Sequence, residues 1–414
     1  MRHASGTDLA LQSFEHNQTA EVDGGRRAWL QVFGSFMIFV NIWGFTFIFG
    51  IFQSFYQLSY LPSESESSIS WIGTIQSALL SIVGVLAGPL YDLGAFRFML
   101  LSGAFLVLLG LFTLSLSSQY YQIFLSQGVC IGIGGGLLYI PSLALISGSF
   151  KRRRAIASGI VTCGIGIGGV IYTAAFQSLL PRVGFAWTVR VLAFMALVVF
   201  GLSIPALLIS TSGQKRSQTT RKIFDVNALK DGPFLVYSLA SFFIFLGYLV
   251  PFFFMPSFAQ IVLGTSRSLS FWALAVSSAT SIFGRLGAAL AAQKMGSMMP
   301  WIACGALSGV LCLCWIRISS VAAFFAFCGL YGFFSGALVA LPPTVFPRIC
   351  KAPNLLGTWM GMSWLCSGIA FLVGSPIAGA LIRLWSGLLL LLGTGTLVAL
   401  WVLMVRTRRE PIWI

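Results

Sequence analysis

The chain has 414 residues, of which 57% are hydrophobic and only 8% are charged, and its formal net charge is +15. Soluble domains carry roughly 25% charged residues, so this composition excludes an ordinary soluble protein and indicates an integral membrane protein. The basic residues lie in short clusters between apolar runs, which is typical of charges that fix orientation in a membrane and excludes a nucleic-acid partner. The eight cysteines form no CxxC pair and predict neither a metal site nor a disulfide framework.

Apolar stretches of membrane-spanning length recur along the whole chain. A helix needs about 20 apolar residues to cross the hydrocarbon core. The first six predicted spans are residues 30–56, 69–90, 98–117, 120–147, 155–179 and 187–210. The last six are residues 233–262, 268–292, 298–316, 320–346, 357–382 and 386–405. The sequence therefore predicts an all-α membrane protein of twelve transmembrane helices in two six-helix halves.

Polar segments divide this pattern into five parts. We expect a cytosolic N-terminal tail at 1–28, an N-terminal half at 29–210, a cytosolic linker at 211–232, a C-terminal half at 233–405 and a cytosolic C-terminal tail at 406–414. With both termini in the cytosol, most lysines and arginines fall on the inner side, as the positive-inside rule requires. The five exceptions are Arg182, Arg190, Arg267, Arg317 and Arg383.

The two halves are related by a short repeat. "GPLYDLG", from Gly88, follows the second predicted span, and a weaker copy, "ALAAQKMG" from Ala289, follows the eighth. Internal repeats of this kind are typical of secondary transporters, whose substrate site lies at the midplane between the repeats. Because a tight turn between helices needs glycine, we expect Gly88 and Gly94 in the turn after the second span.

Six further stretches identify a family resemblance. They are "DGGRRAW" (Asp23–Trp29), "GPLYDLGAFR" (Gly88–Arg97), "FKRRRAIASGI" (Phe150–Ile160), "YLVPFFFMPSFA" (Tyr248–Ala259), "YGFFSGALVALPP" (Tyr331–Pro343) and "GTWMGMSW" (Gly357–Trp364). In this order and on these spans they resemble the monocarboxylate porter branch of the major facilitator superfamily, in its fungal form. The resemblance covers nearly the whole chain from Asp23 onward and implies transport of an organic anion by alternating access.

The loop after the second span is a candidate cytoplasmic gate, formed by Gly88, Asp92, Gly94 and Arg97. The resemblance implies that Asp92 closes the cytoplasmic side by pairing with cations or with a helix N-terminus. Arg97 and the cluster Lys151–Arg154 are candidate partners. A solvated loop aspartate and a positive-inside anchor are the alternatives for these groups.

Arg285 is the principal candidate substrate contact. It lies in "SIFGRLGAAL" (Ser281–Leu290), ~7 Å inward of the midpoint of the eighth span at 1.5 Å per residue. Intramembrane charges usually face a bundle interior and mark a pathway. The resemblance implies that an arginine here binds the substrate carboxylate, which a guanidinium fork suits. The alternatives are a structural or gating role, or snorkelling toward the cytoplasmic surface.

Softer candidate contacts lie near the middle of other spans. They are Asn41, Trp43, Tyr139, Tyr248, Ser335 and Trp364. Tyrosine and tryptophan also pack between helices or anchor at membrane interfaces, and that alternative stays open for each of them. The 37 phenylalanines and 12 tryptophans predict an aromatic cavity, which suits an amphipathic organic anion.

Acidic residues and histidines are absent from the predicted spans, and only Asp92 borders one. Proton-coupled carriers use buried Asp, Glu or His relays. Proton-coupled animal relatives also use a lysine in the first helix, where "NIWGFTFIFG" (Asn41–Gly50) has none. We therefore expect facilitated diffusion, exchange, or a substrate that carries its own proton. A membrane enzyme would need a cluster of such groups, so we predict no enzyme, no cofactor and no metal.

The main functional prediction is a monomeric secondary transporter that moves a small organic anion, a monocarboxylate or related metabolite, across a lipid bilayer. The alternative is an efflux transporter for a secondary metabolite that the cell makes. A non-transporting sensor with a transporter fold is less favoured, because such proteins usually add long cytosolic tails. The expected location is the plasma membrane, with an internal organelle membrane as the alternative.

Overall fold

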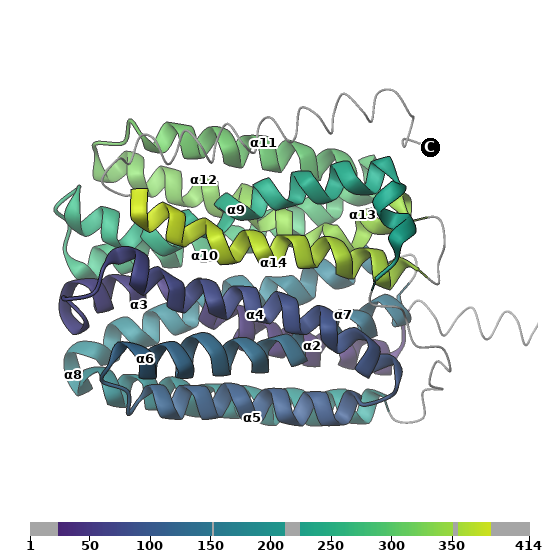
Figure 1. Cartoon of the computed structure of the whole chain (residues 1–414), viewed down its shortest axis with the longest axis horizontal. Helices are drawn as coiled ribbons and strands as arrows, with labels where there is room; N and C mark the ends of the chain where they lie inside the picture. The colour runs from purple at the N-terminus through teal and green to yellow at the C-terminus, as the bar shows by residue number, and fades with distance from the viewer. Residues whose placement is uncertain (1–23, 151–152, 212–223, 351–354, 382–414) are drawn as a thin grey trace, which may run out of the picture.

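The computed structural model describes residues 24–150, 153–211, 224–350 and 355–381, and the regular elements within these ranges are helices (Figure 1). The first group, here called the N-terminal bundle, contains α2 (Arg26–Phe47), α3 (Phe49–Phe55), η1 (Tyr56–Tyr60), α4 (Glu66–Asp92), α5 (Phe96–Leu114), α6 (Tyr120–Ile123), η2 (Phe124–Cys130), α7 (Ile131–Ser149) and α8 (Arg154–Thr211). A short 3-10 helix, η3 (Val226–Lys230), precedes the second group. This C-terminal bundle contains α9 (Gly232–Ile261), α10 (Arg267–Met295), α11 (Met298–Trp315), α12 (Val321–Ala340), α13 (Pro342–Ile349) and α14 (Leu356–Leu381).

Ten helices of the described part are long and apolar enough to cross a membrane, which confirms the predicted all-α membrane architecture. One of them, α8, has 58 residues and covers the two predicted spans 155–179 and 187–210. Its backbone leaves helical geometry at Gly184, where φ is 74°, a conformation that glycine enters without steric cost. The α8 helix is therefore two spans joined at Gly184. The predicted span 386–405 lies outside the described residues.

Glycine and proline determine where the predicted spans turn or break. Gly94 has a φ of 83° in the turn between α4 and α5, as predicted. Gly88 is instead buried inside α4, which continues through Pro89 to Asp92, so the prediction of a turn at Gly88 is wrong. The predicted span 320–346 is divided into α12 and α13, because prolines at the start of α13 cannot donate the backbone hydrogen bonds that would continue α12.

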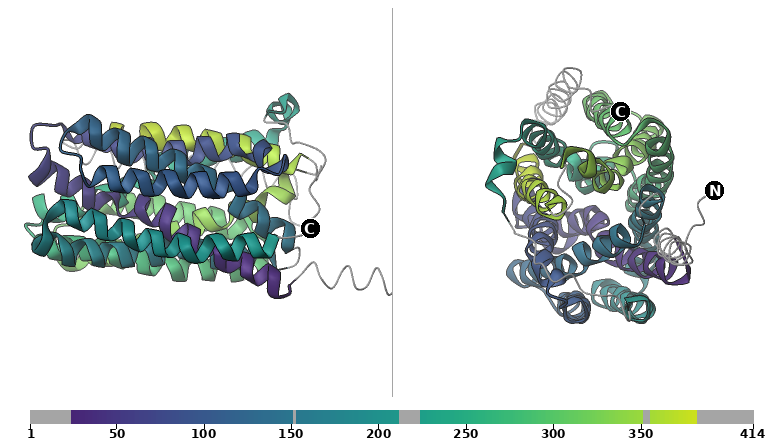
Figure 2. Two further views of the ribbon diagram at one scale, coloured as in Figure 1. Left: turned by 90° about the horizontal axis from the view of Figure 1, so that it is seen from below. Right: turned by 90° about the vertical axis from the view of Figure 1, so that its right-hand side faces the viewer.

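The two bundles lie side by side with their helices roughly parallel to one long axis (Figures 1 and 2). Between the bundles, α4 packs against α14 and α8 packs against α10. Small residues allow this approach: a Cβ added at Gly166 of α8 would lie 2.6 Å from the carbonyl oxygen of Ser278 on α10. Where α8 meets α10, the contact between the bundles is therefore made by main chain and short side chains.

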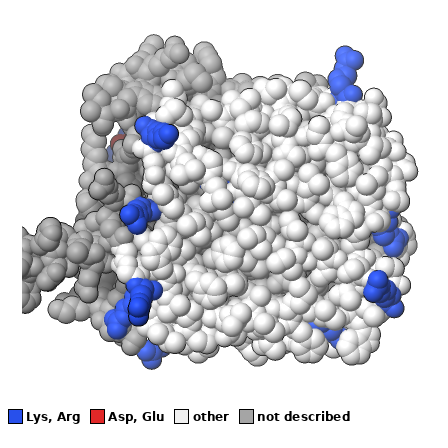
Figure 3. Space-filling model, turned by 180° about the vertical axis from the view of Figure 1, so that it is seen from behind, with Lys and Arg blue, Asp and Glu red and all other residues white. Residues whose placement is uncertain are grey.

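The outer surface has the charge distribution of a membrane protein. Figure 3 shows one face, on which lysine and arginine lie toward the two ends of the helices and the band between them carries no charge. Large apolar side chains are exposed around the molecule, among them Phe98 (70%), Phe105 (63%) and Phe283 (65%). A soluble protein of this size would not expose so many, so this surface is suited to lipid.

Candidate functional site

Arg285 is buried inside the molecule, on the side of α10 that faces the N-terminal bundle. Its side chain is 0% exposed. The Nη1 atom donates a 2.5 Å hydrogen bond to Oγ of Ser281, one turn earlier on the same helix. The Nε and Nη2 atoms have no hydrogen-bond partner among the described residues. The side chain therefore does not snorkel to the surface, and most of its donors are unused.

No carboxylate of the described chain neutralises this guanidinium. The acidic residues within the described ranges are confined to loops and helix ends: Glu64, Glu66, Asp92, Asp225 and Asp231. The guanidinium carbon lies 5.8 Å from the centroid of the Phe47 ring on α2, and such a cation–π contact compensates only part of the cost of burying a charge. Arg285 is therefore a buried cation whose charge is not neutralised by any acidic residue of the described ranges.

Tyr248 on α9 is the nearest polar ring to Arg285. Its hydroxyl lies near enough to the guanidinium to interact with it, although the two groups are not aligned as a hydrogen bond of good geometry. The backbone carbonyl of Tyr248 accepts a 2.9 Å hydrogen bond from the hydroxyl of Tyr331 on α12. This bond ties the turn of α9 that carries Tyr248 to α12, while the hydroxyl of Tyr248 lies near Arg285 of α10.

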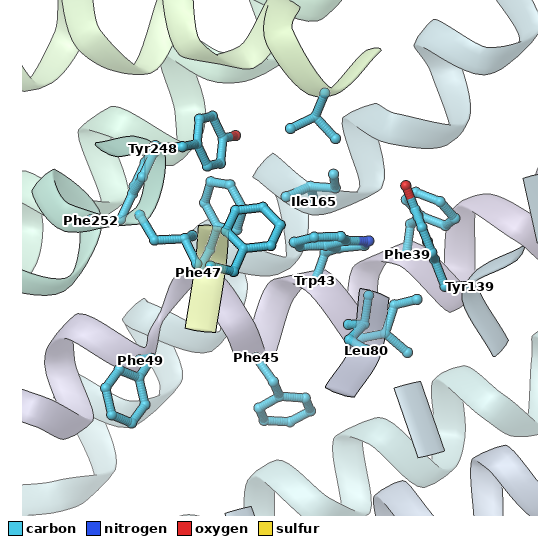
Figure 4. Packing of buried hydrophobic residues seen from close by; sticks show 14 of the residues in the cluster. Phe39, Trp43, Phe45, Phe47, Phe49, Leu80, Tyr139, Ile165, Tyr248 and Phe252 are labelled. Atoms are coloured by element: carbon cyan, nitrogen blue, oxygen red, sulfur yellow. The ribbon is translucent and has the colours of Figure 1, made fainter. Parts of the chain in front are cut away.

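Aromatic rings from both bundles surround this position and form what we call the aromatic cluster. Its members are Trp43 and Phe47 of α2, Tyr139 of α7, Phe245 and Tyr248 of α9, and Trp364 and Phe371 of α14, all less than 10% exposed. The Tyr139 ring stacks on Trp364 at 5.7 Å between centroids and meets Trp43 edge-on at 5.6 Å. Figure 4 shows Tyr248 and Tyr139 on opposite sides of Phe47 and Trp43. The cluster therefore spans the boundary between the bundles.

Unused hydrogen-bond donors are concentrated in and beside this cluster. The indole Nε1 atoms of Trp43 and Trp364, the Tyr248 hydroxyl and two nitrogens of Arg285 are buried without partners among the described residues. Buried polar groups are normally paired, and each unpaired one costs about 1–3 kcal/mol. A set of donors without matching acceptors is the arrangement expected of a site for a ligand rich in acceptors.

The structure brings together five of the predicted substrate contacts: Arg285, Trp43, Tyr139, Tyr248 and Trp364. Asn41 makes other contacts. Its Nδ2 donates to the carbonyl oxygen of Ala196, and its Oδ1 accepts from the Tyr172 hydroxyl at 2.5 Å. The amide of Asn41 is thus engaged in joining α2 to α8.

Ser335, the remaining predicted contact, is fully buried on α12. Its hydroxyl lies 3.4 Å from the carbonyl oxygen of Gly332 on the same helix. Ser335 stays a prediction without a described link to the aromatic cluster.

Three rings of the cluster, Phe47, Phe245 and Phe371, were not predicted as substrate contacts from the sequence. The ring centroid of Phe245 lies 5.2 Å from that of Phe371 and 5.4 Å from that of Trp364. With 37 phenylalanines in the chain, the sequence does not distinguish these three rings from the others. It predicts only that the cavity is aromatic.

The predicted cytoplasmic gate is distributed over the end of α4 and the start of α5. Asp92 is half-buried as the last residue of α4, and Arg97 is exposed in the first turn of α5. Of the cluster Lys151–Arg154, the first two residues lie outside the described ranges, while Arg153 is exposed and Arg154 is half-buried. The gate function of these residues stays a prediction.

The opposite ends of the helices, predicted to face outward, are tied together across the two bundles. Hydrogen bonds run from Ser257 Oγ to Gln57 Oε1 at 3.2 Å, from Gln260 Nε2 to Ser54 Oγ at 2.8 Å, and from Arg267 Nη2 to Ser59 Oγ at 3.0 Å. Above the aromatic cluster, Gly50 of α3 lies directly against the backbone carbonyl of Phe252 on α9. The structure is therefore closed at this end.

Metal chemistry has no support in the described ranges, where no three His, Cys, Asp or Glu side chains are grouped as ligands. The site instead offers one unneutralised cation, neutral donors and aromatic faces. Such an arrangement is chemically complementary to an aromatic or amphipathic anion.

Comparison with known proteins places this geometry in context. Residues 32–346 match the family described as the Major Facilitator Superfamily. The chain is 35% identical over 382 residues to the MFS-type transporter dbaD of Emericella nidulans, covering 91% of this chain and 85% of that protein. It is 32% identical to the aspyridones efflux protein apdF of the same fungus, covering 89% and 74%. It is 34% identical to the agnestins efflux protein AgnL12 of Paecilomyces divaricatus, covering 89% and 86%.

A solved structure shares the same fold. The crystal structure of a mutant of the nucleoside transporter NupG superposes with a TM-score of 0.66, covering 91% of this chain and 99% of that one, at 12% sequence identity. At that identity the likeness shows a shared fold and nothing about the substrate.

Proposed function

The chain belongs to the Major Facilitator Superfamily, and from this premise we propose that it exports an acidic secondary metabolite, with Arg285 as the contact for the substrate's anionic group. Membership makes the protein a multi-pass membrane transporter and not an enzyme. The substrate class, the direction of transport and the role of Arg285 are our proposal.

Efflux of a secondary metabolite, the alternative drawn from the sequence, is better supported than movement of a small monocarboxylate. Two of the relatives are named efflux proteins for aspyridones and for agnestins. The aromatic cluster also favours efflux of a secondary metabolite, because seven large rings that extend away from a cation suit a molecule much larger and more apolar than a short-chain acid. We also propose that the protein belongs to the monocarboxylate porter branch of this superfamily, on the basis of the sequence resemblance and of Arg285.

The observation that carries the proposal is the buried, unneutralised guanidinium of Arg285 at the boundary between the bundles. Leaving a charge unpaired inside a protein costs free energy, and a substrate carboxylate, enolate or phenolate removes that cost when it binds. Arg285 on α10 faces Phe47 on α2, so a ligand held there contacts both bundles. Contact with both bundles is what a carrier needs to couple binding to alternating access.

The hydrogen bonds between the bundles at the end predicted to face outward indicate a conformation that is closed on that side. With hydrogen bonds between the bundles at the ends of α3, α9 and α10, release to the outside requires these contacts to break. We propose that the bundles move as the units 29–210 and 233–405, joined by the linker 211–232, in a monomer of the plasma membrane with both termini cytosolic. Opening of the outer end would then complete export.

Transport of labelled aromatic carboxylic acids into inside-out vesicles tests the proposal. The wild-type protein and Arg285→Gln are compared for each acid and for its neutral primary amide, and uptake by vesicles without the protein is subtracted. We expect the acids to be transported and the amides to be refused. We expect Arg285→Gln to reduce acid transport by at least tenfold. Equal transport of acid and amide, or normal transport by Arg285→Gln, would show that Arg285 is not the anion contact.

A further inference from the structure

We propose that Trp43 and Trp364 form a second, neutral subsite, which recognises a hydrogen-bond acceptor on the part of a planar aromatic substrate that lies away from its anionic group. This inference rests on the proposed function, because it adds a second point of recognition to a substrate held by Arg285. It narrows the substrate class to planar aromatic acids that carry a carbonyl or ether oxygen at the other end.

The two indoles are buried at this place in the protein, and their N–H groups make no hydrogen bond within the described structure. Trp43 is 0% exposed and Trp364 is 7% exposed, and neither Nε1 atom has a partner in the described structure. Other indoles of the same chain are paired: Trp301 donates to the carbonyl oxygen of Leu338 at 3.3 Å, and Trp359 donates to Oδ2 of Asp225 at 2.9 Å. A general inability of this fold to pair indoles therefore does not explain Trp43 and Trp364.

The two indoles come from different bundles and meet at one ring. Trp43 belongs to α2 and Trp364 to α14, and both pack on Tyr139 of α7. In Figure 4 the indole nitrogen of Trp43 lies on the side toward Tyr139 and away from Tyr248. The Trp43 donor is thus at the Tyr139 end of the aromatic cluster, where the Trp364 ring also packs, whereas Arg285 interacts with Tyr248, which lies on the other side of Trp43.

The chemistry of the donors defines what they would bind. An indole N–H donates and cannot accept, so its complement is an oxygen or nitrogen lone pair, and no charge is required. The surrounding faces of Tyr139 and Phe245 favour a flat ring, because aromatic groups stack at such distances. Because one indole comes from each bundle, an acceptor shared between them would contact both bundles at a second point.

A matched pair of acids tests this inference. The probes are 4'-acetylbiphenyl-4-carboxylate, which has a distal carbonyl, and 4'-isopropenylbiphenyl-4-carboxylate, in which a C=CH2 group keeps the planar branched shape without the acceptor. Competition binding to the purified full-length protein gives the ratio of the two affinities, and this ratio does not depend on how much of a variant is active. Losing one neutral hydrogen bond weakens binding by about threefold to tenfold.

We expect the wild-type protein to prefer the acetyl acid by about threefold to tenfold per indole used. Trp43→Phe and Trp364→Phe keep a ring but remove the N–H, so each should reduce the preference, and the double variant should bring it close to one. Trp301→Phe and Trp359→Phe are the matched controls, since their indoles are paired within the protein, and they should leave the preference unchanged.

The outcomes separate this inference from the proposed function. If Arg285→Gln weakens both acids while Trp43→Phe and Trp364→Phe leave the preference intact, the anion site stands and the indole subsite is wrong. If the wild-type protein has no preference between the acids, the subsite is also wrong. If neither acid binds, the class of planar aromatic acids is overturned altogether.

Discussion

Gly284 of α10 packs directly against the backbone carbonyl of Phe333 on α12, so closely that an added Cβ would overlap that carbonyl. Gly284 immediately precedes Arg285, and the contact fixes how near α10 lies to α12. Backbone atoms cannot move aside as a flexible side chain can, so this glycine sets the position of the guanidinium in the site.

Gly284→Ala should therefore destabilise the protein and impair transport. Overpacking costs about 1–3 kcal/mol, which should lower the melting temperature of the purified protein in detergent. Gly287→Ala is the matched control, because a Cβ there would meet only Cζ of Phe333 at 4.0 Å, and alanine favours the helix by about 1 kcal/mol. Equal melting temperatures for the two variants would contradict the close approach of α10 and α12.

Arg285→Met should stabilise the substrate-free protein while it abolishes anion transport. Methionine fills much of the same volume without a charge, and replacing buried charges by apolar groups is often neutral or stabilising by 1–4 kcal/mol. The check is a thermal unfolding measurement on substrate-free protein, beside a transport assay on the same preparation. A lower melting temperature for Arg285→Met would mean that the guanidinium is paired in the folded state, and the anion site would lose its main support.

Asn41→Ala should reduce stability and leave substrate affinity unchanged. The substitution removes the bonds to the Ala196 carbonyl and the Tyr172 hydroxyl, and leaves the buried Tyr172 hydroxyl unpaired, at a cost of about 1–3 kcal/mol. Tyr172→Phe shares one of these bonds, so the double variant should be destabilised by less than the sum of the single ones. A raised KM with an unchanged melting temperature would instead indicate that Asn41 contacts the substrate.

Gly50→Ala should shift the protein toward a conformation that is open at the outer end. The added methyl group would overlap the Phe252 carbonyl between α3 and α9, and an overpacking cost of about 1–3 kcal/mol corresponds to roughly a fivefold to hundredfold change in the equilibrium. A cysteine placed at Ser54, which is 1% exposed in the closed state, reports the change through labelling by a membrane-impermeant maleimide. Gly201→Ala, where nothing lies within 4 Å of the added Cβ, should leave the labelling rate as it is.

Sequence reasoning located the site better than it assigned the individual contacts. Arg285 could be predicted because a charge in an apolar span is rare, and Tyr139, Tyr248 and Trp364 because polar rings near mid-span are few. Phe47, Phe245 and Phe371 could not be separated from the other phenylalanines, since their role depends on which helix faces meet between the bundles. Asn41 was predicted as a contact because it is a polar group near mid-span, and a single sequence does not reveal its hydrogen bond to Tyr172, 131 residues away.

The fold was predicted with similar limits. Hydropathy separates spans 155–179 and 187–210, although α8 is continuous apart from the positive φ at Gly184. Hydropathy also places Gly88 inside the span 69–90, but the preference of tight turns for glycine predicted a turn there, whereas α4 continues to Asp92. Composition and spacing thus predict that a stretch forms a membrane helix more reliably than where that helix ends.

Transport of a permanently charged substrate should be nearly independent of pH. The titratable groups facing Arg285 are Tyr248 of α9 and Cys163 of α8, and no Asp, Glu or His lies inside a predicted span, so no protein group there gains or loses a proton near neutral pH. An aryl sulfonate keeps its charge between pH 5.5 and 7.5, and its uptake into vesicles without a pH gradient should change by less than about twofold over that range. The matched carboxylate should follow only its own protonation. A steep pH dependence for the sulfonate would require a proton-carrying group in the transport path, and would overturn the expectation that the protein has none.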